Sequence, residues 1–154
     1  KYGKCDIHSV DYKKYDAIVI SDYNKGFLSE EDINTIGSSH RCVFLDTKKI
    51  LGLWCESVDF IKINEFEYQN NKENIDKISE GKIIVTLGSK GALYKNETYP
   101  VSKVDIRDVA GAGDSFVAGL SVKYIDCGDI YESIRFANEC ATIVVQKKGV
   151  SVVK

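Results

Sequence analysis

Short apolar runs that alternate with longer amphipathic stretches constrain most strongly how this chain can fold. The runs are rich in Val and Ile and apolar at nearly every position, which is typical of strands buried on both faces of a sheet. We expect strands at residues 16–21, 42–46, 59–63 and 82–87. Because helix-like stretches separate them, the sequence predicts an α/β domain with a largely parallel sheet flanked by helices.

The stretches between these runs suit helices and one hairpin. Ser29 suits a helix cap, because the three acidic residues that follow it favour the positive end of the helix dipole. Further helices are expected at residues 64–79, 112–125 and 130–147. Residues 92–95 and 98–101 suit a β-hairpin with Asn96 in its turn. No repeat or linker interrupts the pattern, so we expect one domain over residues 1–154.

The composition is that of an ordinary globular domain, with 44% hydrophobic residues, 29% charged residues and a formal net charge of -2. This balance provides no basic surface, so we expect no nucleic-acid partner. No apolar run approaches the roughly 20 residues of a membrane helix, and the N-terminal residues do not resemble a signal peptide. We therefore expect no membrane partner and a cytoplasmic protein. The 5 cysteines lack any CxxC spacing, so neither a disulfide framework nor a zinc site is expected.

The strongest chemical signal is the segment DVAGAGDSFV at residues 108–117. Gly111, Ala112 and Gly113 open an apolar-periodic helix, where free backbone N–H groups and the helix dipole bind anions. Asp114 places a carboxylate at the same point, and this carboxylate would repel a resident phosphate. We therefore interpret Asp114 as a base that takes the proton from a hydroxyl attacking a phosphoryl group. The alternative is an Asp helix cap on a tight glycine turn.

Two other phosphate-binding motifs do not fit this segment. A Rossmann GxGxxG motif would need a glycine at position 116, where the chain has Phe116. A P-loop would need the pattern GxxxxGK[ST], which the sequence does not contain.

The GAGD segment resembles the signature of the ribokinase-like, phosphofructokinase-B type carbohydrate kinases, in which it opens a long helix. Three further elements follow in that family's order: an NxxE element at Asn64 and Glu67, a TxGxxG turn at residues 86–92, and a closing helix at residues 136–149. Together they cover about residues 16–152. The resemblance implies a three-layer α/β fold of the ribokinase-like type and ATP-dependent phosphorylation of a sugar hydroxyl.

The resemblance also implies roles for single residues. Asp114 would be the catalytic base, and the amides of Gly111, Ala112 and Gly113 would stabilise charge on the transferred phosphoryl group. Asn64 and Glu67 would position Mg²⁺ through water. The residues that would frame the nucleotide are Thr86, Gly88, Ser89, Gly91 and Asn138.

Each of these roles has a plainer structural alternative. Asn64 and Glu67 also suit a helix cap with an acid in the first turn. Gly88 and Gly91 would equally serve a turn between a strand and a hairpin. Asn138 would otherwise be a polar residue on a helix surface.

Two loops narrow the resemblance to the heptose 7-phosphate kinases of ADP-heptose biosynthesis. The segment SDYNKG at residues 21–26 resembles their SDYxKG loop, and residues 43–48 resemble their DPK element. Asp22, Lys25 and Lys48 would therefore bind the phosphorylated sugar, since ligands bind at the loops that follow strands in open α/β sheets. The alternative is that the two lysines are solvated loop charges.

The sequence departs from the family pattern at a few positions. Thr47 and Ile63 stand where proline is usual, and Val109 and Ala110 stand where the family often has threonine. The last two leave a neighbouring monovalent-cation site in doubt.

The sugar-binding Gly-Gly segment and the β-stranded lid of the family are not found in this chain, which begins with Lys1 and contains no Met. We therefore expect the C-terminal, ATP-binding and catalytic part of a kinase. Alone it should be a poor enzyme, and its exposed sheet edge should favour a homodimer. The expected substrate is heptose 7-phosphate. The alternatives are another ribokinase-like sugar or nucleoside kinase, or a truncated nucleotide-binding module without turnover.

Overall fold

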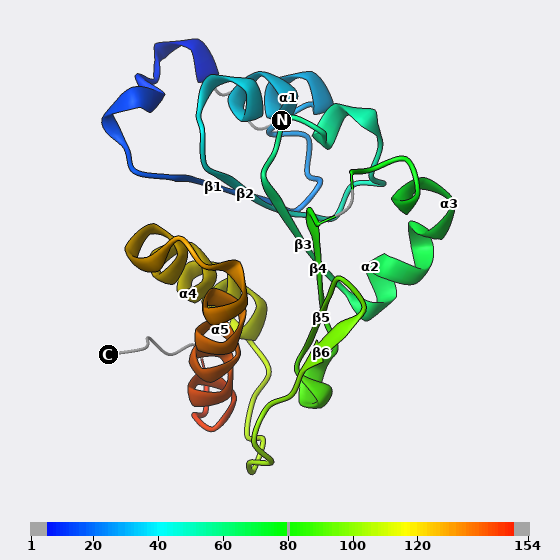
Figure 1. The fold of residues 1–154 in the computed structure, drawn as a ribbon, viewed down its shortest axis with the longest axis vertical. Helices are drawn as coiled ribbons and strands as arrows, with labels where there is room; N and C mark the ends of the chain where they lie inside the picture. The colour runs from blue at the N-terminus through cyan, green and yellow to red at the C-terminus, as the bar shows by residue number, and fades with distance from the viewer. Residues whose placement is uncertain (1–5, 80, 150–154) are drawn as a thin grey trace. The chain divides into compact units, whose positions relative to one another are not determined.

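The computed structural model describes residues 6–79 and 81–149 and divides the chain into two compact units (Figure 1). Unit 1 comprises Lys1–Val85, and unit 2 comprises Thr86–Lys154. Within the described residues, no helix is both long and apolar enough to cross a membrane.

Unit 1 is built on four neighbouring strands, all within two residues of the predicted positions. They are β1 (Ile18–Asp22), β2 (Val43–Thr47), β3 (Phe60–Asn64) and β4 (Ile83–Thr86), in that order. The pairs β1–β2 and β2–β3 are parallel, as predicted, and the N–H of Ile61 donates to the carbonyl of Lys82 at 2.7 Å. Every residue of β2 is buried, which explains the apolar run at Val43–Leu45 and means that Asp46 and Thr47 at its end are buried polar residues.

Helix α1 (Glu30–Ser39) lies on one side of these strands in Figure 1. Its predicted start is confirmed by a capping box. The Oγ of Ser29 accepts from the N–H of Asp32 at 3.1 Å, and the carboxylate of Asp32 accepts from the N–H of Ser29 at 2.8 Å. Ile33 and Ile36 form its buried face. Short 3₁₀ turns occur at Ile7–Ser9, Tyr12–Lys14 and Leu53–Cys55.

The single helix predicted at residues 64–79 is wrong. Two short helices stand there instead, α2 (Glu65–Asn70) and α3 (Lys72–Ile75), and they are separated at Asn71. The buried Asn71 side chain donates to the carbonyl of Glu67 at 2.7 Å and accepts from the N–H of Leu51 at 2.6 Å. An asparagine that bonds backbone groups in this way competes with helical hydrogen bonding, so the helix stops.

Unit 2 opens with the predicted hairpin. A 3₁₀ turn at Gly88–Lys90 leads into β5 (Ala92–Tyr94), which pairs antiparallel with β6 (Glu97–Tyr99). The two turn residues, Lys95 and Asn96, both have positive φ, at 47° and 62°. Two consecutive residues of this kind define the turn that matches strand twist in a tight hairpin, which explains why asparagine occurs there.

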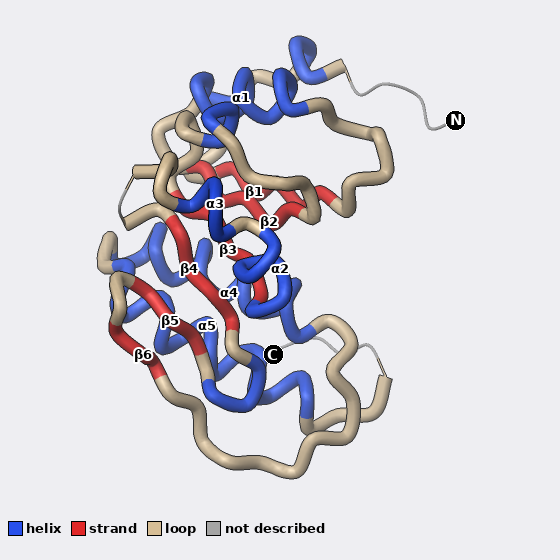
Figure 2. Tube along the Cα trace, turned by 90° about the vertical axis from the view of Figure 1, so that its right-hand side faces the viewer, coloured by secondary structure: helices blue, strands red, loops and turns tan. Residues whose placement is uncertain are grey.

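Two long helices complete unit 2, close to their predicted bounds. Helices α4 (Ala112–Cys127) and α5 (Ile130–Val145) lie side by side in Figures 1 and 2. Their close approach favours a glycine, because a Cβ at Gly119 would lie 2.8 Å from the Sγ and 3.1 Å from the Cβ of Cys140. The Asp129 carboxylate caps α5 by accepting from the N–H groups of its first turn.

Replacing Gly91 by alanine should lower the free energy of unfolding by about 3 kcal/mol, because it combines backbone strain with a clash. Gly91 has φ +94°, and a Cβ there would lie 1.9 Å from the carbonyl oxygen of Tyr99. Gly88→Ala is the matched control, because Gly88 has φ +58° but no atom within 4 Å of a built Cβ. The control should cost only about 1 kcal/mol. Equal losses for the two variants in urea denaturation would contradict the packing argument.

Candidate nucleotide-binding and catalytic site

A cavity of about 520 Å³ lies wholly within unit 2. Apolar side chains form much of its wall, contributed by Val101, Val104, Ile106, Val109, Phe116 and Val145. The sequence-predicted residues that line it are Thr86, Gly88, Ser89, Gly91, Ala112, Gly113 and Asn138. A largely apolar cavity of this size with a few convergent polar groups is typical of a small-molecule site.

Asn138 is buried within α5, so its interpretation as a surface polar residue is wrong. Its side-chain amide donates to the carbonyl of Tyr99 at 2.8 Å. Tyr99 ends β6, and the segment that forms part of the cavity wall begins two residues later at Val101. Asn138 therefore fixes the backbone at the point where this segment leaves the hairpin.

The GAGD segment forms the start of α4. Gly111 is the N-cap residue and has φ 76°, in the left-handed region that glycine adopts without strain. The N–H of Ala112 donates to the carbonyl of Val109 at 3.2 Å, so this amide contributes to the turn itself. Asp114 lies in the first helical turn and is exposed. Since Gly111 holds the N-cap position, the alternative that Asp114 is the cap residue is wrong.

Asp108 ties the loop before α4 to the chain after α5. One carboxylate oxygen accepts from the N–H of Ala110 at 2.9 Å, and the other accepts from the N–H of Gly149 at 3.1 Å. These hydrogen bonds favour the charged form and lower the pKa of Asp108 below its ordinary value. The N–H groups of Arg107 and Asp108 also donate to the carbonyl of Val145. The loop that leads into α4 is therefore fixed both by the Asp108 side chain and by backbone hydrogen bonds to the end of α5.

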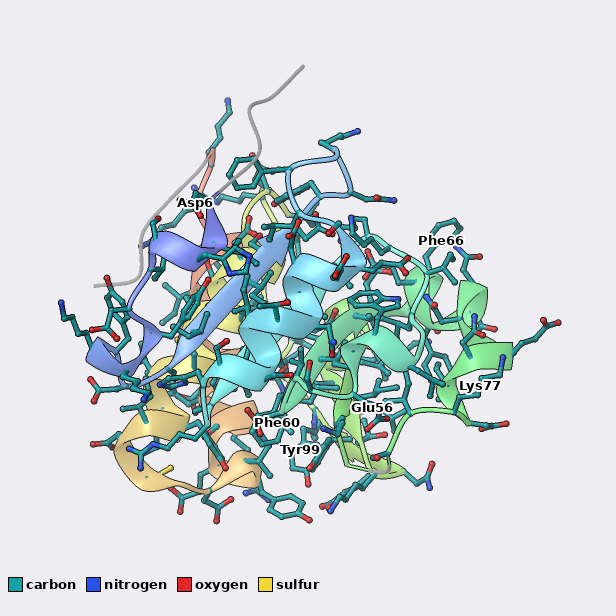
Figure 3. All side chains as sticks on the ribbon, turned by 90° about the horizontal axis from the view of Figure 1, so that it is seen from above. Asp6, Glu56, Phe60, Phe66, Lys77 and Tyr99 are labelled. Carbon is teal, nitrogen blue, oxygen red and sulfur yellow. The ribbon has the colours of Figure 1, made fainter. Side chains whose placement is uncertain are left out.

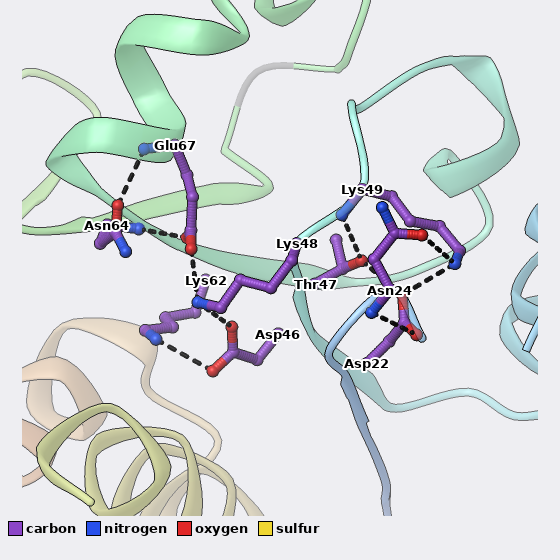
Figure 4. Close-up of polar contacts among 9 residues, drawn as sticks. All are labelled: Asp22, Asn24, Asp46, Thr47, Lys48, Lys49, Lys62, Asn64 and Glu67. Atoms are coloured by element: carbon purple, nitrogen blue, oxygen red, sulfur yellow. Dashed lines mark hydrogen bonds and ion pairs between the residues drawn. The ribbon is translucent and has the colours of Figure 1, made fainter. Parts of the chain in front are cut away.

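Unit 1 carries a second group of predicted residues, at the carboxyl ends of its strands (Figure 4). Asn64 and Glu67 form a capping box at α2, in which each side chain accepts from the other's backbone N–H at 2.8 Å. The capping alternative is therefore present in the structure. It leaves the other carboxylate oxygen of Glu67 free to accept from Lys48.

Lys48 lies between two carboxylates. Its Nζ donates to Glu67 and lies 3.9 Å from Oδ1 of Asp46. Burial alone would lower the pKa of Lys48, but the hydrogen bond to Glu67 and the two negative charges outweigh it and raise the pKa. Lys48 is therefore an exposed loop lysine, as the alternative expected, but its positive charge is held in an ion pair.

The oxygens beside Lys48 suit a hard divalent cation. Oδ1 of Asp46 is buried and makes no hydrogen bond in the described part of the chain, whereas Oδ2 accepts from Lys62 at 2.9 Å. Carboxylate and amide oxygens are the donors that Mg²⁺ prefers, often through its retained waters. Glu67, Asn64 and Asp46 supply oxygens of this kind, but the side-chain oxygens of Glu67 and Asn64 already accept hydrogen bonds, and the described residues contain no group of three acidic, His or Cys side chains that could hold a metal directly.

The remaining predicted substrate residues lie in different environments. Asp22 is 5% exposed, and its carboxylate bonds to groups of the same unit, whereas Lys25 is exposed on the loop that follows β1. The structure therefore brings Asn64, Glu67 and Lys48 together, while Lys25 projects from a separate loop.

Asp46, Lys49 and Lys62 also contribute to this region, although the sequence did not single them out. All three are buried, and each has an oppositely charged partner. A usable signal was present, because Lys62 interrupts an apolar strand and Asp46 ends one. Charges in buried strands require partners, so their pairing could have been predicted.

The α/β fold, the glycine-rich start of α4 and the apolar cavity are together the features of a ribokinase-like kinase. The family model of the pfkB family carbohydrate kinases matches residues 14–153. The chain therefore belongs to this family, and the predicted family and fold are confirmed.

Two curated relatives are similar in sequence to most of this chain but to only a part of their own length. The bifunctional protein HldE of Sulfurimonas denitrificans is 32% identical over 161 residues, which cover 90% of this chain and 34% of that protein. Probable fructokinase-3 of Arabidopsis thaliana is 33% identical over 122 residues, which cover 66% of this chain and 35% of that protein. The chain thus spans about a third of the length of these relatives.

Solved structures share the fold at lower identity. The ribokinase of Thermotoga maritima superimposes with a TM-score of 0.75 at 20% identity, covering 94% of this chain and 56% of that one. The ribokinase of Arabidopsis thaliana, solved with ribose and ATP, gives a TM-score of 0.65 at 21% identity, covering 88% of this chain and 51% of that one.

Proposed function

We propose that this chain is the ATP-binding and catalytic part of a longer sugar kinase, which transfers the γ-phosphoryl group of ATP to a hydroxyl of heptose 7-phosphate. The observation that carries the proposal is the glycine-rich start of α4, which lines an apolar cavity and places the exposed carboxylate of Asp114 in its first turn. The similarity to HldE across 90% of the chain supports the choice of a heptose phosphate in ADP-heptose biosynthesis.

In this proposal the cavity of unit 2 holds the nucleotide. Its apolar wall would receive the base, and Thr86, Gly88, Ser89, Gly91 and Asn138 frame it. The start of α4, at Gly111, Ala112 and Gly113, would stabilise charge on the transferred phosphoryl group through the helix dipole. Asp114 would take the proton from the attacking hydroxyl, as a general base does in phosphoryl transfer.

The oxygens of Asn64, Glu67 and Asp46 would hold Mg²⁺ through its waters. Mg²⁺ held there would neutralise negative charge on a phosphate group. Lys48, whose ammonium is charged, would supply a further positive group for a phosphate.

The proposed acceptor is a phosphorylated sugar. Lys25, exposed in the SDYNKG loop, would bind the phosphate of the sugar together with Lys48. Similarity to a probable fructokinase supports a second candidate, a kinase for an unphosphorylated hexose. Use of ATP would place either reaction in the cytoplasm.

A homodimer is also part of the proposal. Strand β1 stands first in the strand order, and Val19 on it is 46% exposed. An exposed strand edge offers backbone groups for pairing with a second chain. Sedimentation across a concentration series would decide this point, and a strictly monomeric chain would argue against it.

Asp114→Asn should abolish turnover while leaving ATP affinity within a few-fold, because loss of a general base typically costs about 10²–10⁴-fold in rate. The measurement is ADP release by the longer protein with heptose 7-phosphate, fructose or ribose, beside calorimetry of ATP binding. Asp126→Asn is the matched control, an exposed acid on the same helix. A near-wild-type kcat in Asp114→Asn would refute the assignment of Asp114 as the general base. If the wild-type protein binds ATP but phosphorylates none of these sugars, the alternative of a nucleotide-binding module without turnover is supported.

Glu67→Gln should raise the Mg²⁺ concentration for half-maximal rate several-fold, because it removes a negative charge from the outer shell of the cation. Glutamine can still complete the capping box at this position, so the helix should lose little stability. Glu65→Gln, in the same first turn but outside the box, is the control. An unchanged Mg²⁺ titration in Glu67→Gln would indicate that Asn64 and Glu67 serve only to cap α2 and do not position the cation.

A further inference from the structure

A group of polar contacts joins the loop after β1 to the loop after β2 (Figure 4). One oxygen of Asp22 accepts from the hydroxyl of Thr47 at 2.8 Å and pairs with Nζ of Lys49 at 3.1 Å. The other oxygen accepts from the N–H of Asn24 at 3.1 Å. The same Nζ of Lys49 also donates to Oδ1 of Asn24 at 3.1 Å. Lys49 therefore links both ends of the turn formed by Asp22 and Asn24.

The side chains of Asp22, Thr47 and Lys49 are shielded from water, whereas Asn24 is exposed. Asp22 is 5% exposed, Thr47 1% and Lys49 9%. Two buried charges are stable only when they are paired and their remaining hydrogen-bonding groups are satisfied. Asp22 and Lys49 meet this condition through each other, Thr47 and Asn24, so the arrangement has little freedom to change.

The turn held by these contacts contains two residues in the left-handed region. Asn24 has φ 53°, and Gly26 has φ 80°. The left-handed conformation costs about 1–2 kcal/mol for a residue with a side chain, although asparagine adopts it more readily than most. Lys25 stands between these two residues and is exposed. Its position therefore depends on what holds Asn24.

Thr47, the last residue of β2, also connects the loop after β1 to the loop after β2. Its hydroxyl donates to Asp22 and accepts from the N–H of Lys49 at 3.1 Å, while the N–H of Lys48 donates to the carbonyl of Asp22 at 3.0 Å. Proline, which is usual at this position in the DPK element, has no hydroxyl and could make neither side-chain bond. The departure from the family pattern thus adds a connection between the two loops.

We propose that Lys49 is a positioning residue, which holds the Asp22–Asn24 turn so that Lys25 is presented to the phosphorylated sugar. Asp22 then belongs to the support of the loop and is not a substrate ligand. The part that concerns the sugar rests on the function proposed above, whereas the part that concerns the loop does not.

The loop is tested first without any substrate. In Lys49→Met, the amides of Asn24 and Lys25 should exchange hydrogen about tenfold faster, and trypsin should cut after Lys25 correspondingly faster, because a hydrogen bond to a charged group is lost. Lys77→Met is the matched control, since Lys77 also donates to an asparagine, Asn74, at 3.0 Å, but is exposed at the periphery (Figure 3). Unchanged exchange and cleavage at the loop would overturn the proposal.

Lys49→Met leaves the carboxylate of Asp22 buried without its cation, so this variant could lose global stability. The double variant Asp22→Asn/Lys49→Met removes both charges and avoids that penalty. It still lacks the bond to Asn24, so loop exchange should remain faster than in the wild type at equal stability to urea. Wild-type exchange in the double variant would show that Lys49 contributes only to stability.

Kinetics of the longer protein then test the substrate. Lys49→Met should raise KM for the sugar phosphate about tenfold and leave KM for ATP within twofold. In Lys49→Arg, which keeps the positive charge, KM for the sugar phosphate should return part of the way to the wild-type value. Equal changes in both KM values would overturn the assignment of this loop to the sugar. A faster-exchanging loop in a protein that phosphorylates no sugar would instead uphold the role of Lys49 and reject the proposed function.

Discussion

The pairing of Lys62 with Asp46 is the interaction on which the polar end of unit 1 depends. These residues stand opposite each other in the register of β2 and β3, and their ion pair is buried. A slip of one residue in either strand would turn its charged side chain to the other face of the sheet and separate the pair, leaving two uncompensated charges in the interior. The register is therefore specified by charge as well as by apolar packing. It aligns the ends of these strands, where Lys48 and Glu67 meet.

The periodicity of the sequence predicted most of the secondary structure because the information is local. Strands with continuous apolar runs, the capping box at Ser29 and the turn at Asn96 all follow from neighbouring residues. The break between α2 and α3 does not, because Asn71 stops the helix partly through a bond to Leu51, 20 residues away. Interactions that span such distances leave no periodic signal.

The candidate site was predictable where a motif names its residues and unpredictable where irregular backbone forms it. The TxGxxG turn and Asn138 were identified from the sequence and line the cavity. The segment from Val101 to Val109 forms much of the same wall but has no strand or helix periodicity to reveal it. Lys49 escaped notice for a different reason. A lysine beside another lysine in a loop has the sequence character of a surface residue, and only its partners show that it is buried.

The capping box at α2 bears on how such kinase segments change over evolutionary time. Asn64 and Glu67 begin a helix by bonding each other's backbone, and that contribution to folding persists whether or not a cation ever binds. Purifying selection for a foldable chain would preserve the pair even in a descendant that had lost catalysis. Asp114 is exposed in the first turn of α4 and is not part of its cap, so it has no role in starting the helix of the kind that Asn64 and Glu67 have. If Asp114 is the base proposed above, the residue at position 114 would distinguish working kinases from pseudoenzymes among diverged copies of this chain, whereas the NxxE pair would not.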